Sequence, residues 1–206
     1  MSDELILYTN PMSRGRIARW MLEEVGAPYT TDVVFYGDGM KSAGYRAINP
    51  MGKVPALRHR GTTITETAAI CAYLADAFPQ AGLAPPLDRR GAYYRWLFFA
   101  AGPLESGITM RSFGLNLDDK QQRTAGCGSY ADLMDTLEKA VSNGPYIAGD
   151  AFSAADVYVG SHIGWGLQFG TVEPRPAFND YWDRLKVRPA HRRAEDIDNA
   201  LMPAEQ

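Results

Sequence analysis

The sequence predicts two domains of different class, an α/β domain followed by an all-helical domain. Within residues 1–80 short apolar runs alternate with helical patterns, whereas beyond residue 87 apolar residues recur only at helical spacing. Between the two regions the chain is rich in Ala, Gly and Pro, which is typical of a connection. We therefore expect a first domain over 1–80, a linker over 81–87 and a helical domain over 88–206. A chain of 206 residues is long enough for two small domains.

The first domain is predicted to open with a β-α-β unit. Residues 5–8 are an apolar run that ends at Thr9-Asn10-Pro11, which indicates a short buried strand. A helix follows, with apolar residues at helical spacing and Gly26 as its stop. Its apolar face consists of Ile17, Trp20, Met21 and Val25. A second strand is expected over residues 31–35.

The rest of this domain is predicted to contain a hairpin and a final helix. Residues 41–48 allow at most a short irregular helix. Residues 55–58 and 62–65 are predicted to form a hairpin around Arg60-Gly61. A helix should then run from Glu66 to the stop at Pro79. The order β-α-β-α-β-β-α is that of a thioredoxin-like domain.

In the second domain the clearest helix start is Ser153-Ala154-Ala155-Asp156. Ser153 can accept the amide of Asp156, Asp156 can return the bond, and Phe152 can pack against Val157. We expect these residues to serve folding, with a cost of about 1 kcal/mol for the loss of Asp156. Earlier in the same domain, Gly102-Pro103 should bend or interrupt a helix.

Composition excludes several classes of function. A net charge of −3 provides no basic field for nucleic acid, and no apolar run approaches the roughly 20 residues of a membrane span. The N-terminus, Met1-Ser2-Asp3-Glu4, lacks the features of a secretory signal. The two cysteines are far apart and the three histidines have no metal-ligand spacing, so we expect neither disulfide nor metal. A reducing cytoplasm is the expected location.

The most informative stretch is Asn49-Pro50-Met51-Gly52-Lys53-Val54-Pro55-Ala56-Leu57, with Glu66-Thr67 nine residues later. Pro55 lacks an N–H and restricts Val54 to an extended conformation, so that the Val54 backbone is free to pair with a peptide-like ligand. Glu66 and Thr67 open a helix, where a carboxylate, a hydroxyl and free amides can meet a small zwitterion. Glutathione has this chemistry. The pattern N-P-x-G-K/Q-V-P-x-L followed by E-S/T resembles the glutathione transferase superfamily.

The resemblance implies a cytosolic, bacterial-type glutathione transferase, most similar to the serine-type classes. In these classes the activating hydroxyl follows the first strand, and Ser13, two residues after Pro11, matches that position. A hydrogen bond to a charged group contributes about 1.5–3 kcal/mol, enough to lower a thiol pKa by about 1–2 units. The alternative for Ser13 is that it only caps the helix.

Two other residues compete with Ser13 for the activating role. Tyr8, at the end of the first strand, matches the tyrosine-type classes, although it can equally be a packing residue. Asn10 can also donate to sulfur. Arg14 and Arg16 oppose the helix dipole unless an anion is near, and the simpler interpretation is that both are solvated.

The resemblance also implies the residues that hold glutathione. Lys53 and Lys41 can each pair with the glycine carboxylate. Val54 and the cis peptide bond expected before Pro55 present the backbone to the ligand. Glu66 resembles the residue that receives the γ-glutamyl ammonium, and Thr67 replaces the commoner serine with its hydroxyl retained.

The expected function is activation of the glutathione thiol for attack on a small hydrophobic electrophile bound by the helical domain. Glutathione is then a co-substrate, and a homodimer is implied by the resemblance alone. The same scaffold hosts isomerases, dehalogenases and reductases, although a reductase is disfavoured because residues 11–16 lack a cysteine. A non-catalytic glutathione-binding or interaction protein is the alternative of a different class.

Overall fold

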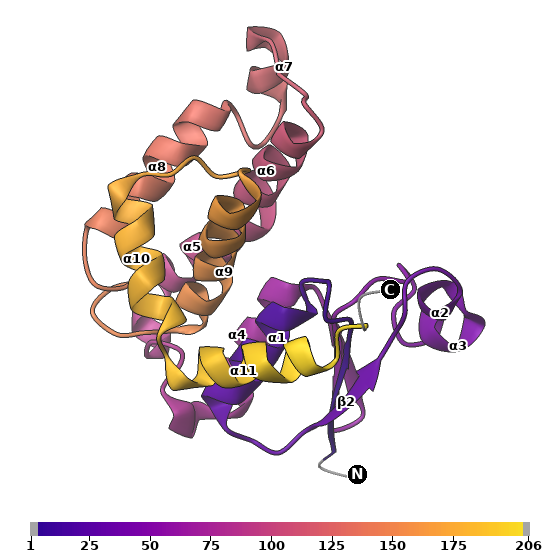
Figure 1. Cartoon of the computed structure of the whole chain (residues 1–206). Helices are drawn as coiled ribbons and strands as arrows, with labels where there is room; N and C mark the ends of the chain where they lie inside the picture. Colours follow the sequence, from indigo (N-terminus) through magenta and orange to yellow (C-terminus); the bar gives the residue numbers. More distant parts are fainter. Residues whose placement is uncertain (1–3, 204–206) are drawn as a thin grey trace. The chain divides into compact units, whose positions relative to one another are not determined.

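A computed structural model describes residues 4–203 and divides the chain into two compact units (Figure 1). Unit 1 holds the residues up to Leu83 together with those from Val187 onward, and unit 2 spans Ala84–Lys186. The sequence-based division differs at its end, because helix α11, Pro189–Ala200, belongs to unit 1. The physical reason is that α11 buries Ala190, Ala194 and Asp198 and packs on α1, Gly15–Val25.

Unit 1 contains a four-stranded mixed sheet, as the thioredoxin-like prediction requires. The strands are β1 Leu5–Thr9, β2 Thr30–Val33, β3 Ala56–His59 and β4 Thr62–Thr65. Their order is β2-β1-β3-β4, with β1 parallel to β2 and antiparallel to β3, and with β3 and β4 joined as the predicted hairpin. The thioredoxin-like element order is confirmed.

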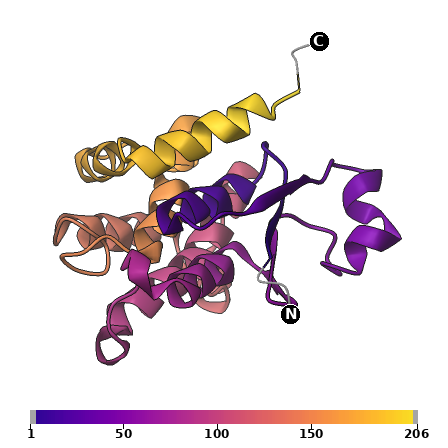
Figure 2. The ribbon, with the colours of Figure 1, turned by 90° about the horizontal axis from the view of Figure 1, so that it is seen from below.

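Helices cover the two faces of this sheet differently. Leu5, Leu7 and Leu57 are buried on the face that carries α1 and α4, Thr67–Ala77. Tyr8 and Ala56 belong to the opposite face, where they pack with residues of α2, Asp38–Lys41, and α3, Ala43–Arg46. Figure 2 shows α11 running alongside α1.

Unit 2 is helical, and it contains no strand ladder among residues 84–186. Its helices are α5 Gly91–Phe99, α6 Glu105–Ser112, α7 Asp119–Thr124, α8 Tyr130–Ser142, α9 Ala154–Phe169 and α10 Pro176–Lys186. A π-helical segment, Ala100–Leu104, joins α5 to α6 and accommodates Pro103. The predicted disturbance at Gly102-Pro103 therefore takes the form of a widened helical turn.

Helix α9 forms the centre of unit 2. A Cβ added to Gly160 would lie 2.4 Å from Leu185, and one added to Gly164 would lie 2.5 Å from Trp182, so both glycines permit the close approach of α10. The predicted capping box at Ser153 and Asp156 is formed. No helix in the described part of the chain is long and apolar enough to cross a bilayer.

Candidate functional site

The segments that the sequence singles out begin at one edge of the sheet in unit 1. Tyr8 pairs with Ala56, and Ala56 pairs with Thr65, so the three residues form one rung. The chain that leaves β1 and β4, and the chain that enters β3, therefore start side by side. These segments are the turn Asn10–Ser13, the Val54-Pro55 dipeptide and the Glu66-Thr67 pair.

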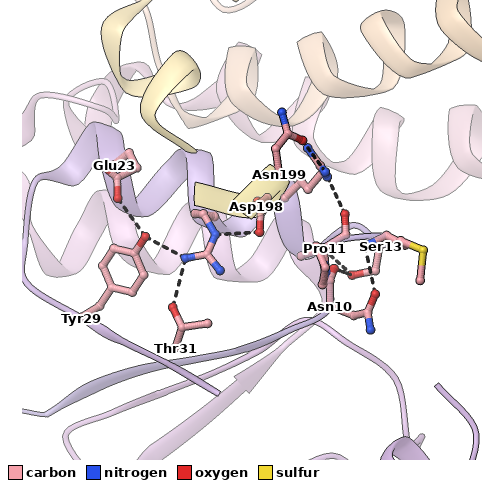
Figure 3. A network of polar contacts seen from close by, with 12 residues as sticks. Asn10, Pro11, Ser13, Glu23, Tyr29, Thr31, Asp198 and Asn199 are labelled. Carbon is pink, nitrogen blue, oxygen red and sulfur yellow. Dashed lines mark hydrogen bonds and ion pairs between the residues drawn. The ribbon is translucent and has the colours of Figure 1, made fainter. Parts of the chain in front are cut away.

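Ser13 lies in the turn before α1, two residues ahead of the first helical residue. Its hydroxyl donates to the carbonyl oxygen of Asn10 at 2.7 Å and accepts the N–H of Gly15 at 3.0 Å (Figure 3). The Ser13 side chain is half-buried. Because a thiolate is a stronger acceptor than a neutral carbonyl, a rotation of this hydroxyl toward an anionic sulfur is chemically favourable.

Asn10 anchors this turn to the sheet. Its side chain is buried, donates from Nδ2 to the carbonyl of Val34 at 3.1 Å and accepts the N–H of Met12 at Oδ1, 3.0 Å away. Both ends of the amide therefore engage backbone groups. In this structure Asn10 shapes the turn that presents Ser13.

Tyr8 lies within the core of the opposite sheet face. Only 6% of the residue is exposed, and its ring packs 6.1 Å from that of Tyr45, in a cluster with Val34 and Ala56. This environment corresponds to the packing role that the sequence analysis kept as an alternative for Tyr8.

Gly15 is required where α1 begins against the end of β1. A Cβ at this position would lie 1.8 Å from Oγ1 of Thr9 and 3.0 Å from Oγ of Ser13. Thr9 is fully buried, and its hydroxyl has no hydrogen-bond partner among the described residues. A side chain at position 15 would thus have to displace the Thr9 side chain or the Ser13 turn.

The Val54–Pro55 peptide bond is cis, as predicted. The preceding carbonyl of Lys53 accepts the hydroxyl of Tyr45 at 2.7 Å and the amide of Asn49 at 2.8 Å, which fixes the approach to Val54. The N–H and carbonyl of Val54 themselves have no partner within residues 4–203. An extended backbone with both groups open is a pairing site for another peptide.

The two predicted lysines lie close together along the chain path. The ammonium of Lys41 donates to the carbonyls of Met51 at 3.1 Å and Gly52 at 2.9 Å, and Lys53 is the next residue, with an exposed side chain. The acceptors of Lys41 are neutral, so its charge is not compensated by them. Together the lysines make this corner attractive to a carboxylate.

Glu66 has a backbone conformation that is unusual for its residue type, with φ 66° and ψ 116°. It stands directly before α4, whose first turn has no side-chain cap, and the following Thr67 is buried. Strained non-glycine residues cluster at ligand sites. The Glu66 carboxylate can accept an ammonium group, and the open amides of α4 can bind a carboxylate. The pair is thus suited to the α-amino-acid end of a peptide.

A polar network that no sequence pattern predicted joins α11 to this region (Figure 3). Arg16 donates from Nε to the carbonyl of Pro11 and from Nη2 to Oδ1 of Asn199, at 2.8 Å. The interpretation of Arg16 as solvated is therefore wrong. Its partner lies 183 positions away, and no local motif marks the pair.

Unit 2 contains its own cavity, of about 260 Å³, between α6 and α8. Met110, Arg111, Cys127 and Tyr130 contribute to its wall, and the guanidinium of Arg111 lies 4.2 Å from the centroid of the Tyr130 ring. Of the two cysteines, Cys71 is completely buried, and burial raises the pKa of its thiol, so it is not a nucleophile at neutral pH. In the part of the chain that the structure describes, no cluster of His, Cys, Asp or Glu could hold a metal ion.

Comparison with known sequences identifies the family of this chain. The family described as "Glutathione S-transferase, N-terminal domain" matches residues 12–77. Protein LigF of Sphingobium sp. is 53% identical, over 71% of this chain and 74% of that protein. Glutathione S-transferase hmp2 of Hypomyces subiculosus is 27% identical, over 88% of this chain and 93% of its relative.

Solved structures extend the similarity over almost the whole chain. A glutathione transferase from Methylococcus capsulatus superposes with a TM-score of 0.77 at 27% identity, covering 95% of this chain and 99% of that one. A sphingomonad glutathione S-transferase complexed with glutathione gives a TM-score of 0.76 at 27% identity, with coverages of 94% and 98%. The chain belongs to the glutathione transferase superfamily.

Proposed function

We propose that the edge formed by Asn10–Ser13, Val54-Pro55 and Glu66-Thr67 binds glutathione and ionises its thiol for attack on a hydrophobic electrophile. The observation that carries this is the single rung Tyr8–Ala56–Thr65, from which the three segments start. Glutathione-bound relatives, such as the Sulfitobacter homologue at 25% identity, support the choice of ligand.

The chemistry of glutathione fits the order of groups along this edge. Glu66 would receive the γ-glutamyl ammonium, while Thr67 and the open amides of α4 would bind the adjacent carboxylate. The unpaired backbone of Val54 would pair with the cysteinyl residue. Lys41 and Lys53 would neutralise the glycine carboxylate.

Ser13 would stabilise the thiolate. Its hydroxyl would leave the carbonyl of Asn10 and donate to sulfur, and the amino end of α1 favours the same anion. A bond of about 1.5–3 kcal/mol corresponds to a thiol pKa lowered by about 1–2 units, which makes a substantial fraction nucleophilic at neutral pH. The thiolate then forms a bond to the electrophilic carbon as the leaving group departs.

The electrophile would bind to the helical domain, whose exposed aromatic side chains offer apolar surface. Phe113 and Phe169 are examples, each 72% exposed. The homodimer and the cytoplasmic location remain predictions.

The test is a titration of the ultraviolet absorbance of thiolate in bound glutathione. We expect Ser13→Ala to raise the thiol pKa by about 1–2 units and to slow conjugation of a chloronitrobenzene in proportion. Tyr8→Phe, a matched loss of one hydroxyl from the buried cluster, should leave the pKa unchanged. The opposite pattern would assign activation to Tyr8, and no effect from either variant would assign it to Asn10 or to backbone amides.

A non-catalytic glutathione-binding protein is the second candidate. It is favoured by one observation, the commitment of the Ser13 hydroxyl to Asn10 and Gly15 in the manner of a turn-forming serine. Binding of glutathione at an unperturbed thiol pKa, without turnover of any electrophile, would decide for this function.

A further inference from the structure

Ion pairs and a hydrogen bond connect helix α11 to α1 along the whole length of α1. The two helices run antiparallel, since later residues of α11 meet earlier residues of α1. The pairs are Arg188 with Glu24, Arg193 with Glu23, Asp198 with Arg19, and Asn199 with Arg16. The last pair reaches the end of α1 that adjoins the Ser13 turn.

The inner pair, Arg19 with Asp198, is structural. Both side chains are almost completely buried, the contact measures 2.8 Å, and Arg19 also donates to Tyr29 and Thr31. Burial raises the pKa of Asp198 despite the neighbouring guanidinium. This pair fixes the register of α11 on α1. The next residue, Asn199, is exposed to solvent at the border of the contact between the two helices.

Arg16 joins Asn199 to the turn that carries Ser13. Its guanidinium donates hydrogen bonds to both the side chain of Asn199 and the carbonyl of Pro11. Pro11 follows Asn10, whose carbonyl holds the Ser13 hydroxyl. Both acceptors of these Arg16 bonds are neutral, so the bonds orient the cation without cancelling its charge. The Asp198 carboxylate, which pairs with Arg19, also interacts electrostatically with Arg16.

We propose that Asn199 is a positioning residue for thiol ionisation, acting through Arg16. The inference rests on the proposed function of Ser13 as the thiolate donor. Asn199 restrains the guanidinium, the guanidinium restrains the Pro11 carbonyl, and the turn thereby holds Ser13 in place for sulfur. An oriented cation beside the turn also favours the thiolate over the thiol.

The experiment measures the thiol pKa of bound glutathione and the kcat/KM of conjugation. Asn199→Ala should raise the pKa by about half a unit to one unit and lower kcat/KM about 3- to 10-fold, because each pKa unit is a tenfold change in thiolate. Asn199→Gln keeps a neutral carbonyl acceptor on an exposed side chain and should recover most of the loss. Glu195→Ala is the matched control, an exposed residue of the same helix without a polar partner in the described structure.

A double-mutant cycle identifies the route of the effect. In an Arg16→Ala background, Asn199→Ala should change neither the pKa nor kcat/KM further. Additive effects of the two substitutions would overturn this inference. So would a thiol pKa that is lowered in the parent and stays equally low in Asn199→Ala. Either result leaves the role of Ser13 intact. An unperturbed thiol pKa in the parent would overturn the proposed function, and this inference with it.

Discussion

Replacement of Asp156 by alanine tests how unit 2 is held together. The carboxylate is completely buried and accepts four hydrogen bonds. The donors are the N–H of Ile147 at 2.8 Å, the N–H and hydroxyl of Ser153 at 2.8 and 2.9 Å, and the hydroxyl of Tyr181 at 2.8 Å. One side chain thus joins the start of α9, the preceding loop and α10.

The structure makes this loss larger than that of a helix cap. Each hydrogen bond to a buried charge contributes about 1.5–3 kcal/mol, and Asp156→Ala would leave the donors unpaired. Desolvation of the carboxylate offsets part of this, since burial raises the pKa of Asp156 even though every bond acts to lower it. We therefore expect a net loss of about 3–5 kcal/mol of unfolding free energy, in place of the ~1 kcal/mol expected for a cap.

The assay is urea unfolding followed by circular dichroism. Ser129→Ala is the control, because it removes an exposed cap at the start of α8 and should cost about 1 kcal/mol. If Asp156→Ala does not fold, Tyr181→Phe is measured in its place. It removes one of the four hydrogen bonds and should cost about 1–2 kcal/mol of unfolding free energy. An Asp156→Ala cost no greater than that of Ser129→Ala would refute the argument.

Three further predictions concern the site and the pH dependence. Gly15→Ala should lose about 1–3 kcal/mol of unfolding free energy in urea and raise the pKa of the bound thiol, because the added Cβ meets Thr9. A second substitution, Thr9→Ala, removes the side chain that the Cβ meets. If the double variant recovers neither the stability nor the thiol pKa, the explanation is contradicted. Glu66→Ala should change stability by less than about 0.5 kcal/mol while raising the KM for glutathione at least about tenfold, and an unchanged KM would remove Glu66 from the site. The raised pKa of Asp156 means that the folded state binds a proton which the unfolded chain releases near pH 3.8, so unfolding free energy should fall as the pH rises through the raised value. Asp156→Asn should lack this slope at pH values above about 3.8, and identical slopes would exclude Asp156 as its source.

Local patterns were sufficient wherever the physics is local. An apolar run predicted β1, Gly26 and Pro79 marked the ends of helices, and Arg60-Gly61 marked the hairpin. The stretch from Asn49 to Leu57 predicted an unpaired Val54 backbone for the same reason, since proline acts on its immediate neighbours. The cis bond before Pro55 was expected from the family resemblance.

Contacts between distant residues could not be obtained in this way. The stretch 187–206 has helical periodicity whichever unit it joins, so only packing against α1 assigns it to unit 1. Similarly, a solvated arginine and one fixed by Asn199 have the same local sequence.

The sequence by itself thus determined the family, the thioredoxin-like order of elements and the segments that can hold a peptide-like ligand, because these depend on residue type and spacing along the chain. Tertiary structure alone decided that the segments share one sheet edge, that Tyr8 is in the core, that Asp156 has four partners and that α11 reaches the Ser13 turn. These features depend on which distant residues the folded backbone brings within hydrogen-bonding or packing distance.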